Sequence, residues 1–255
     1  MRFVYPLLLF TATAGVLAAA DSPFVGKWKL NPAKSQLAGI TTTYEQLPSG
    51  EIMTTSGGQS YKFKMDGKDY PAPFGSTIAW KQIDSNTWES TTKNPGMQTT
   101  NAIKLSADGK TLTETVAGKK PNGESFETTA TSQRVSGGPG LMGKWKSTHV
   151  KPVNEMWEIK ASGADGICVE IADYQAEVDL QFDGKDYAPT GPTVPKNFTM
   201  SAKKTGPRSF DMIEKFDGKV VYNDSFSVSA DGKVMTLESG SPGSNEKVKV
   251  VYDRQ

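Results

Sequence analysis

Two short motifs recur at one fixed spacing along this chain of 255 residues, and this repetition restricts the possible folds more than any other feature. Gly26-Lys27-Trp28-Lys29 returns 117 residues later, at 143–146, and Asp66-Gly67-Lys68-Asp69-Tyr70 returns at 183–187 with the same spacing. A third string, Ser106-Ala107-Asp108-Gly109-Lys110, returns at 229–233. A unit of this length is too long for a solenoid module, so each copy is expected to have its own core.

The boundary between the copies is predicted at 136–140. Ser136-Gly137-Gly138-Pro139-Gly140 is the stretch richest in Gly and Pro, and this composition is typical of a linker. The first domain is therefore predicted at 22–135 and the second at 141–255. Each would have about the size of an ordinary domain.

Alternating side chains predict β-strands in both copies. Polar and apolar residues alternate over 60–65 and, with the same parity, over 177–182, so one face of each strand is apolar. Asp-Gly follows each strand and is favoured in type I′ hairpin turns, and further hairpins are predicted at Asp108-Gly109, Asp217-Gly218 and Asp231-Gly232. A flat meander would expose its edges, and closure removes them. The predicted fold class is all-β, with two tandem antiparallel up-and-down β-barrels.

Residues 1–20 differ from the rest of the chain and predict a cleaved signal peptide. Arg2 is the only charge, the stretch 3–10 is almost wholly apolar, and three alanines precede Asp21. An uncleaved membrane anchor is the alternative. We expect a secreted or periplasmic protein with no stable membrane insertion after cleavage. Cys168 is the only cysteine, which excludes an internal disulfide and favours a bacterial periplasm or medium over a eukaryotic extracellular fluid.

Each copy opens on Gly-x-Trp, at Trp28 and Trp145, and carries an arginine in its last strand, at Arg134 and Arg254. This pattern resembles that of calycins, which include lipocalins and fatty-acid-binding proteins. The ends of the mature chain also look like those of uncharacterised secreted bacterial lipocalin-like proteins, which usually have a single domain. The resemblance implies a tandem duplication in which each Trp closes one barrel end under the arginine of its own copy, in a cation–π contact.

Charge and reactive side chains exclude several functions. The 29 basic and 28 acidic residues leave a net charge of +1, without the basic surface of a nucleic-acid-binding protein. His149 is the only histidine and is expected on the surface, since no Gly-x-Ser-x-Gly nucleophile motif accompanies it. One His and one Cys exclude the usual zinc ligand sets, and no metal or cofactor is predicted. Cys168 is expected to be a buried, inert thiol. We therefore expect no enzymatic activity.

Two functions remain open at this stage. A barrel of about eight strands can hold one small ligand, which would be hydrophobic. The alternative is a structural or interaction module of the cell envelope with side-chain-filled barrels and no ligand. The first copy is expected to be the better binding domain, because Trp80 has no Trp counterpart in the second. The predicted ligand-binding residues are Tyr61, Phe63, Met65, Trp80, Val178, Leu180 and Phe182.

Overall fold

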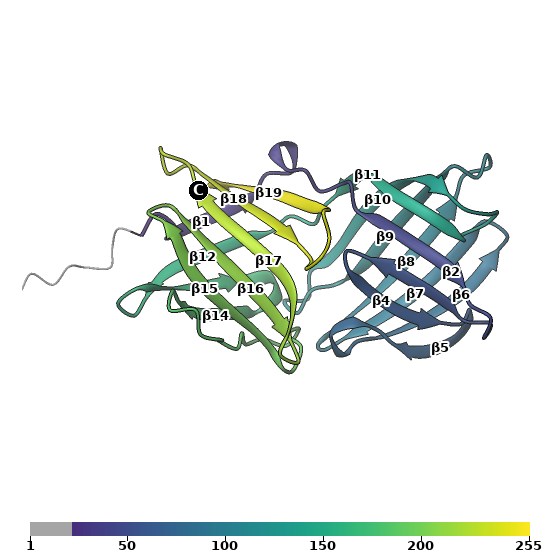
Figure 1. Cartoon of the computed structure of the whole chain (residues 1–255), viewed down its shortest axis with the longest axis horizontal. Coiled ribbons are helices and arrows are strands. Elements are labelled where there is room, and N and C mark those ends of the chain that lie inside the picture. The colour runs from purple at the N-terminus through teal and green to yellow at the C-terminus, as the bar shows by residue number, and fades with distance from the viewer. Residues whose placement is uncertain (1–21) are drawn as a thin grey trace, which may run out of the picture.

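The computed structural model describes residues 22–255, so the predicted signal peptide lies outside the described residues. The described chain forms nineteen strands in two antiparallel sheets of nine and ten strands. Each sheet curves into a nearly closed barrel, and the barrels follow one another along the long axis of the molecule (Figure 1). The predicted all-β fold with two antiparallel barrels is confirmed.

We call the ten-stranded sheet the insert barrel, because the chain enters it after β1 and leaves it before β12. The hydrogen-bonded order is β4-β3-β2-β11-β10-β9-β8-β7-β6-β5. Its strands are β2 (Thr41–Gln46), β3 (Ile52–Ser56), β4 (Gln59–Phe63), β5 (Asp66–Pro71), β6 (Thr77–Asp84), β7 (Thr87–Asn94), β8 (Met97–Leu105), β9 (Thr111–Lys119), β10 (Ser125–Ser136) and β11 (Gly143–Lys151).

We call the nine-stranded sheet the split barrel, because its first strand is separated in sequence from the other eight. The order is β14-β13-β12-β1-β19-β18-β17-β16-β15. Its strands are β1 (Gly26–Leu30), β12 (Met156–Ser162), β13 (Gly166–Ile171), β14 (Ala176–Gln181), β15 (Phe198–Gly206), β16 (Ser209–Phe216), β17 (Lys219–Val228), β18 (Val234–Gly240) and β19 (Lys247–Arg254).

The first strand of each repeat lies in the barrel of the other repeat. β1 pairs with β12 and β19, whereas β11 pairs with β10 and β2. The two buried clusters follow this exchange: Trp28 packs with Ile159, and Trp145 packs with Tyr44. The predicted domains at 22–135 and 141–255 are therefore corrected: β2 to β11 form one barrel, and β1 with β12 to β19 forms the other. Both first strands open on Gly-Lys-Trp-Lys, so each barrel takes this motif from the other repeat, as in domain swapping.

The stretch 136–140 belongs to a hairpin, and the predicted linker is wrong. It joins β10 to β11, which are paired neighbours in one sheet. A Cβ at Gly137 would lie 2.3 Å from the Cα of Gly143, so the glycines permit close approach of two strands. The barrels are connected instead by 31–40, between β1 and β2, and by 152–155, between β11 and β12.

An arginine lies over a tryptophan in each barrel, but the pairing within repeats implied by the resemblance is wrong. The guanidinium of Arg254 lies 4.2 Å from the ring centre of Trp28, and that of Arg134 lies 4.1 Å from the ring centre of Trp145. Each indole is almost fully buried. The contact is therefore made between repeats, because each first strand has crossed to the other barrel.

The repeated Ser-Ala-Asp-Gly-Lys string supports this contact. The Nε of Arg134 donates to the carbonyl of Gly109 at 2.7 Å, and the Nε of Arg254 donates to the carbonyl of Gly232 at 2.5 Å. These glycines lie in the turns between β8 and β9 and between β17 and β18. The hairpins predicted there, and at Asp217-Gly218 between β16 and β17, are confirmed.

Asp66-Gly67 and Asp183-Gly184 do not form the predicted hairpin turns. β4 and β5 lie at opposite edges of their sheet, so no ladder joins the strands around Asp66. The Asp66 carboxylate instead accepts the hydroxyl of Tyr70 at 2.9 Å, and Asp183 accepts that of Tyr187 at 3.2 Å. The repeated motif is an Asp–Tyr corner that redirects the chain.

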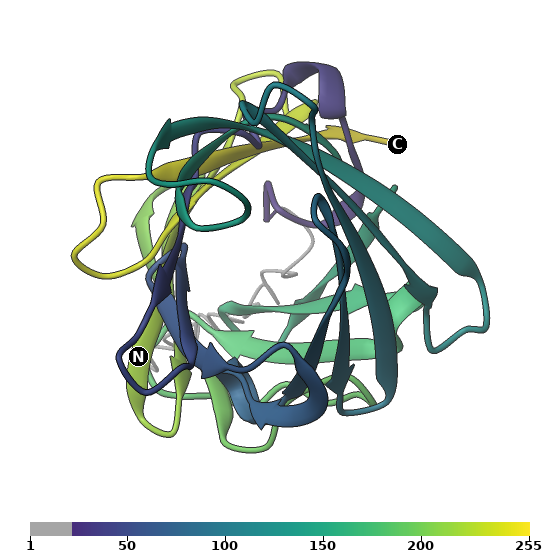
Figure 2. The ribbon, with the colours of Figure 1, turned by 90° about the vertical axis from the view of Figure 1, so that its right-hand side faces the viewer.

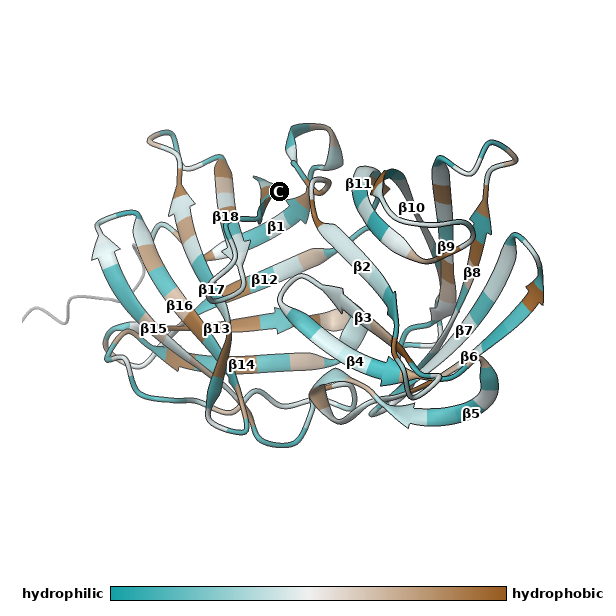
Figure 3. Ribbon diagram, turned by 45° about the vertical axis from the view of Figure 1, so that its right-hand side comes forward, coloured by the Kyte–Doolittle hydropathy of each residue, from teal (hydrophilic) through white to brown (hydrophobic). Residues whose placement is uncertain are grey.

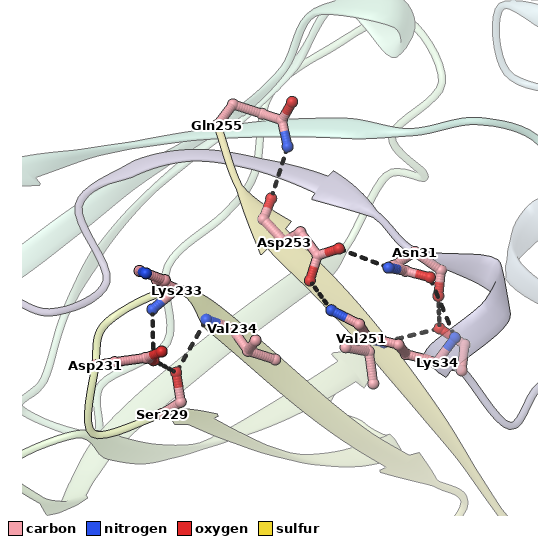
Figure 4. Close-up of polar contacts among 10 residues, drawn as sticks. Asn31, Lys34, Ser229, Asp231, Lys233, Val234, Val251, Asp253 and Gln255 are labelled. Carbon is pink, nitrogen blue, oxygen red and sulfur yellow. Dashed lines mark hydrogen bonds and ion pairs between the residues drawn. The ribbon is translucent and has the colours of Figure 1, made fainter.

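The segment Asn-Pro-Ala-Lys-Ser, present only in the first repeat, fastens the connection after β1 to the last strand. Asn31 donates to the Asp253 carboxylate at 2.5 Å, and the Lys34 ammonium lies 2.8 Å from its other oxygen (Figure 4). Ser35 Oγ accepts the backbone N–H of Val251 at 2.9 Å. The connection is thereby held on the outside of the split barrel.

The two barrels meet end to end, so that strands of both surround a common centre when viewed along the long axis (Figure 2). Phe74 of the insert barrel packs against Phe216 and Tyr222 of the split barrel, with ring centres 5.6 and 6.2 Å apart. Lys120, whose side chain is 3% exposed, pairs with Asp173 across the junction at 2.5 Å. The junction therefore has both an apolar and a charged anchor.

Disulfide trapping distinguishes exchanged from unexchanged barrels. Lys27 lies opposite Glu158, and the equivalent residue of the second repeat, Lys144, lies opposite Thr43. Without exchange of the first strands, Lys27 would instead lie opposite Thr43. In a Cys168→Ser background, we expect Lys27→Cys with Glu158→Cys to oxidise to an internal disulfide, because directly opposed residues have Cβ atoms about 4.5–5.5 Å apart. Lys27→Cys with Thr43→Cys is the matched control. Mass spectrometry of the oxidised, full-length protein reads the result, and ready oxidation of the control pair alone would contradict the exchange.

A double-mutant cycle measures the barrel-closing contact. We expect Trp28→Leu and Arg254→Ala to couple by about 1–2 kcal/mol in urea unfolding, because the cation–π contact is largely removed from water. Trp28→Leu and Arg134→Ala should be additive within about 0.5 kcal/mol, since they lie in different barrels. Coupling between Trp28→Leu and Arg134→Ala, with additivity between Trp28→Leu and Arg254→Ala, would instead support a contact between Trp28 and the arginine of its own repeat.

Candidate functional site

A cavity of about 450 Å³ lies inside the split barrel. Its walls are the inward faces of β12 to β18 and the irregular segment before β15. The apolar lining residues include Trp157, Ile159, Ile167, Val169, Ile171, Val178, Leu180, Val194, Met200, Phe210, Met212, Phe226 and Leu237.

Alternation along the strands makes this cavity apolar. Val169 lies between Ile159 and Val178 on adjacent strands, and all three point inward. On the opposite wall Phe210 and Phe226 are directly paired and stacked, with ring centres 4.6 Å apart. Figure 3 shows this apolar character along β13 and β14, in contrast to the more polar β3 and β4 of the insert barrel. The space is well suited to a small hydrophobic molecule.

Two acidic side chains interrupt the apolar wall. Asp224 lies opposite Met212, and Glu214 lies opposite Tyr222, so the two acids are diagonal neighbours on adjacent strands. Both line the cavity, and Asp224 is 5% exposed. Its Oδ1 atom has no hydrogen-bond partner among the described residues. The cavity therefore contains an unsatisfied acceptor in otherwise apolar surroundings.

Burial and mutual proximity keep this pair partly protonated. Burial, with the nearby Asp224 charge as the second cause, raises the pKa of Glu214 to about 8. Burial also raises the pKa of Asp224, although contacts with Ser239 and Glu214 oppose this effect. Two carboxyl groups this close resist losing both protons. Near neutral pH Glu214 therefore keeps its proton.

A second cavity, of about 390 Å³, lies in the insert barrel and is polar. Several inward positions of the insert barrel correspond in register to inward positions of the split barrel. At each of them the insert barrel has a polar residue and the split barrel an apolar one. The pairs are Thr42 and Trp157, Thr54 and Val169, Ser56 and Ile171, and Ser90 and Met212. Tyr222 lines both cavities, so they approach each other at the junction.

Buried polar groups surround the insert-barrel cavity. Burial raises the pKa of Tyr61 to about 12, so its hydroxyl stays protonated at neutral pH. Burial also raises the pKa of Glu114, whereas a hydrogen bond from Asn101 opposes that rise. Trp80 stacks on Phe63 with ring centres 4.6 Å apart. This barrel lacks the continuous apolar lining of its neighbour.

The seven residues predicted for ligand binding are divided between the two barrels. Tyr61 and Trp80 line the polar cavity, and Val178 and Leu180 line the apolar one. Phe63, Met65 and Phe182 pack within the two cores. The larger apolar space lies in the split barrel, contrary to the expectation that the first repeat offers the better hydrophobic site.

Sequence reasoning missed Glu214, Tyr222 and Asp224. The strand alternation could have identified them. Every second residue of each strand points inward: Phe210, Met212 and Glu214 on β16, and Tyr222, Asp224 and Phe226 on β17. The remaining inward positions nearby are apolar. An acid in that register is a candidate site residue.

The single histidine and the single cysteine lie outside these cavities. His149 is exposed, in agreement with its predicted surface position. Cys168 is only half-buried, so the expectation of a buried thiol is wrong. Burial, followed by the charge of Glu177, raises the pKa of the thiol to about 11. Cys168, Glu170 and Glu177 place possible metal ligands within 4.8 Å of one another, but Glu170 already pairs with Lys160 at 2.6 Å.

No protein-family model, curated protein or solved structure matches this chain. Within residues 22–255, no helix is long and apolar enough to span a membrane.

The buried acid pair predicts a stability that falls as pH rises. Between about 4.5 and about 8 the folded state retains a proton on Glu214 that the unfolded chain releases, so folding is progressively disfavoured. We expect Glu214→Gln to stabilise the protein by on the order of 2 kcal/mol at pH 9 and much less at pH 5. Urea unfolding at both pH values measures this difference. Glu238→Gln, on the exposed face of β18, is the control. An equal effect of Glu214→Gln at both pH values would contradict the prediction.

Proposed function

We propose that this chain binds a small hydrophobic molecule in the split-barrel cavity and does not act on it chemically. The single observation that carries the proposal is the apolar cavity of about 450 Å³. Ligand pockets generally have about 300–1,000 Å³ and mostly apolar walls with a few polar groups. The alternative, a structural module with filled barrels, is less well supported because each barrel contains open space.

The irregular wall between β14 and β15 is the entry route in this proposal. Residues 182–197 join the neighbouring strands through isolated bridges such as Glu177–Thr190 and Tyr187–Met200. Fewer ladder hydrogen bonds need to break here than between two regular strands, so local opening costs less. Val194, in the same segment, lines the cavity.

The proposal includes a secreted or periplasmic location and a relationship to calycins. The basic start, apolar centre and terminal alanines of residues 1–20 support export. The Gly-x-Trp strand beneath an arginine of the last strand supports the likeness to calycins. Both statements agree with a carrier of a poorly soluble molecule.

Filling the cavity provides the test. Val169→Phe adds bulk at the centre of the apolar wall, and Thr54→Phe adds it at the corresponding position of the insert barrel. We expect Val169→Phe to weaken binding of the neutral fluorescent probe N-phenyl-1-naphthylamine by about tenfold or more, because the free volume is occupied. Thr54→Phe should leave binding nearly unchanged.

Fluorescence titration of the full chain measures both affinities, and near-ultraviolet circular dichroism verifies that each variant is folded. Loss of binding only in Thr54→Phe would move the site to the insert barrel. No saturable binding by the unmodified protein would overturn the proposed function.

A further inference from the structure

The acid pair gives the split-barrel cavity a charge preference, and this inference rests on the proposed function. We infer that the cavity selects amphiphilic amines, whose apolar body fills the barrel while a protonated nitrogen lies between Glu214 and Asp224. The ligand class follows from three features of the site: the arrangement of the acids, the absence of a basic partner, and the contrast with the insert barrel.

The two carboxyl groups converge on one region of the wall. Their diagonal positions on β16 and β17 allow one nitrogen to contact both. Asp224 is only 5% exposed, and its Oδ1 has no hydrogen-bond partner within residues 22–255. An ammonium group has three donors, so it can satisfy this oxygen and a Glu214 oxygen together. Hydrogen bonds between charged groups are the strong ones in such surroundings.

No basic side chain among the described cavity residues neutralises the pair. The other titratable groups of the lining are Glu177 and Tyr222. On β19, the hydroxyl of Tyr252 donates a hydrogen bond to the Glu155 carboxylate at 3.3 Å, so this contact adds no cation either. Lys215 is next to Glu214 in sequence, but its ammonium pairs with Asp186 at 2.7 Å. A buried carboxylate without a counter-ion is costly, so a cationic ligand would supply what the protein lacks.

The fold does not require acids at these positions. In the insert barrel, the residue opposite Ser90 is Asn101, just as Asp224 is opposite Met212. Glu214 corresponds in the same way to Thr92. Among the described residues, the insert-barrel cavity has a single acid in its lining, Glu114, which has a hydrogen bond with Asn101. The pair of adjacent acids therefore occurs in the barrel with the apolar lining, where burial of charge is most costly.

Proton exchange accompanies binding in this scheme. Without ligand, Glu214 retains its proton near neutral pH, because burial and the nearby Asp224 charge raise its pKa to about 8. An ammonium group favours the doubly ionised pair, so its binding releases that proton to solvent. Affinity for amines should therefore increase from pH 6 to pH 8, while the amine itself, with a pKa near about 10, stays charged.

Three ligands with the same chain and different head groups test the inference. Isothermal titration calorimetry of the full chain at pH 7.5 compares octylamine, octanol and octanoate. We expect octylamine to bind about tenfold or more tightly than octanol, and octanoate most weakly. Asp224→Asn and Glu214→Gln should each reduce the amine preference to about threefold or less, without weakening octanol binding. The same titrations are repeated in buffers of different ionisation enthalpy. The measured binding enthalpy should depend on the buffer, and so report proton release, for octylamine alone.

Glu238→Gln is the matched control, because it removes the same charge from the exposed face of the split barrel. It should leave the amine preference unchanged. Equal binding of octylamine and octanol would overturn this inference and leave the proposed function intact. Absence of binding for all three ligands, and for N-phenyl-1-naphthylamine, would overturn both. If one acid variant fails to fold, the other variant and the proton release still decide the outcome.

Discussion

Closure of each barrel depends on an arginine of the last strand that lies over the tryptophan of the first strand. The guanidinium covers the indole at about the same distance in both barrels, 4.1 and 4.2 Å. Its nitrogens also donate to backbone carbonyls of the neighbouring turns, including Gly109 and Gly232. One side chain thus joins the first strand, the last strand and a hairpin. Because the Trp and Arg of this closure are present in both repeats, the same contact can form with the first strand of the other repeat.

Exchange of the first strands has consequences at the junction. Each first strand lies in the barrel of the other repeat, so the chain must cross between the barrels after it. The two crossing segments are 31–40 and 152–155. The barrels are then held end to end by Phe74 in its aromatic cluster and by the ion pair between the buried Lys120 and the partly exposed Asp173. A buried cation without its partner would be costly, which favours one orientation of the two barrels. Tyr222 lines both cavities, which approach each other at this junction.

The two repeats keep the closure but differ in what they enclose. The positions that support the fold, including the Gly-x-Trp strand and the Asp–Tyr corner, are the same in both. The lining of the insert barrel is mostly polar, and that of the split barrel is mostly apolar apart from its acid pair. Such divergence changes the chemistry of the interior at little cost to the framework, because the cavity-lining side chains are not those that close the barrel. The two interiors therefore differ in their chemistry.

Strand periodicity, the tight turns and the Trp–Arg motif were readable in the sequence, because they depend on local alternation and on turn chemistry. They determined an all-β protein with two barrels. Parity also placed Val178, Leu180, Tyr61 and Trp80 inside, and it would have placed Glu214 and Asp224 there. Only the tertiary structure decided which first strand closes which barrel, since both strands open on the same Gly-Lys-Trp-Lys motif and this motif does not distinguish their partners. It also decided the cavity volumes and the pairing of the two acids, because these depend on side chains brought together from many strands.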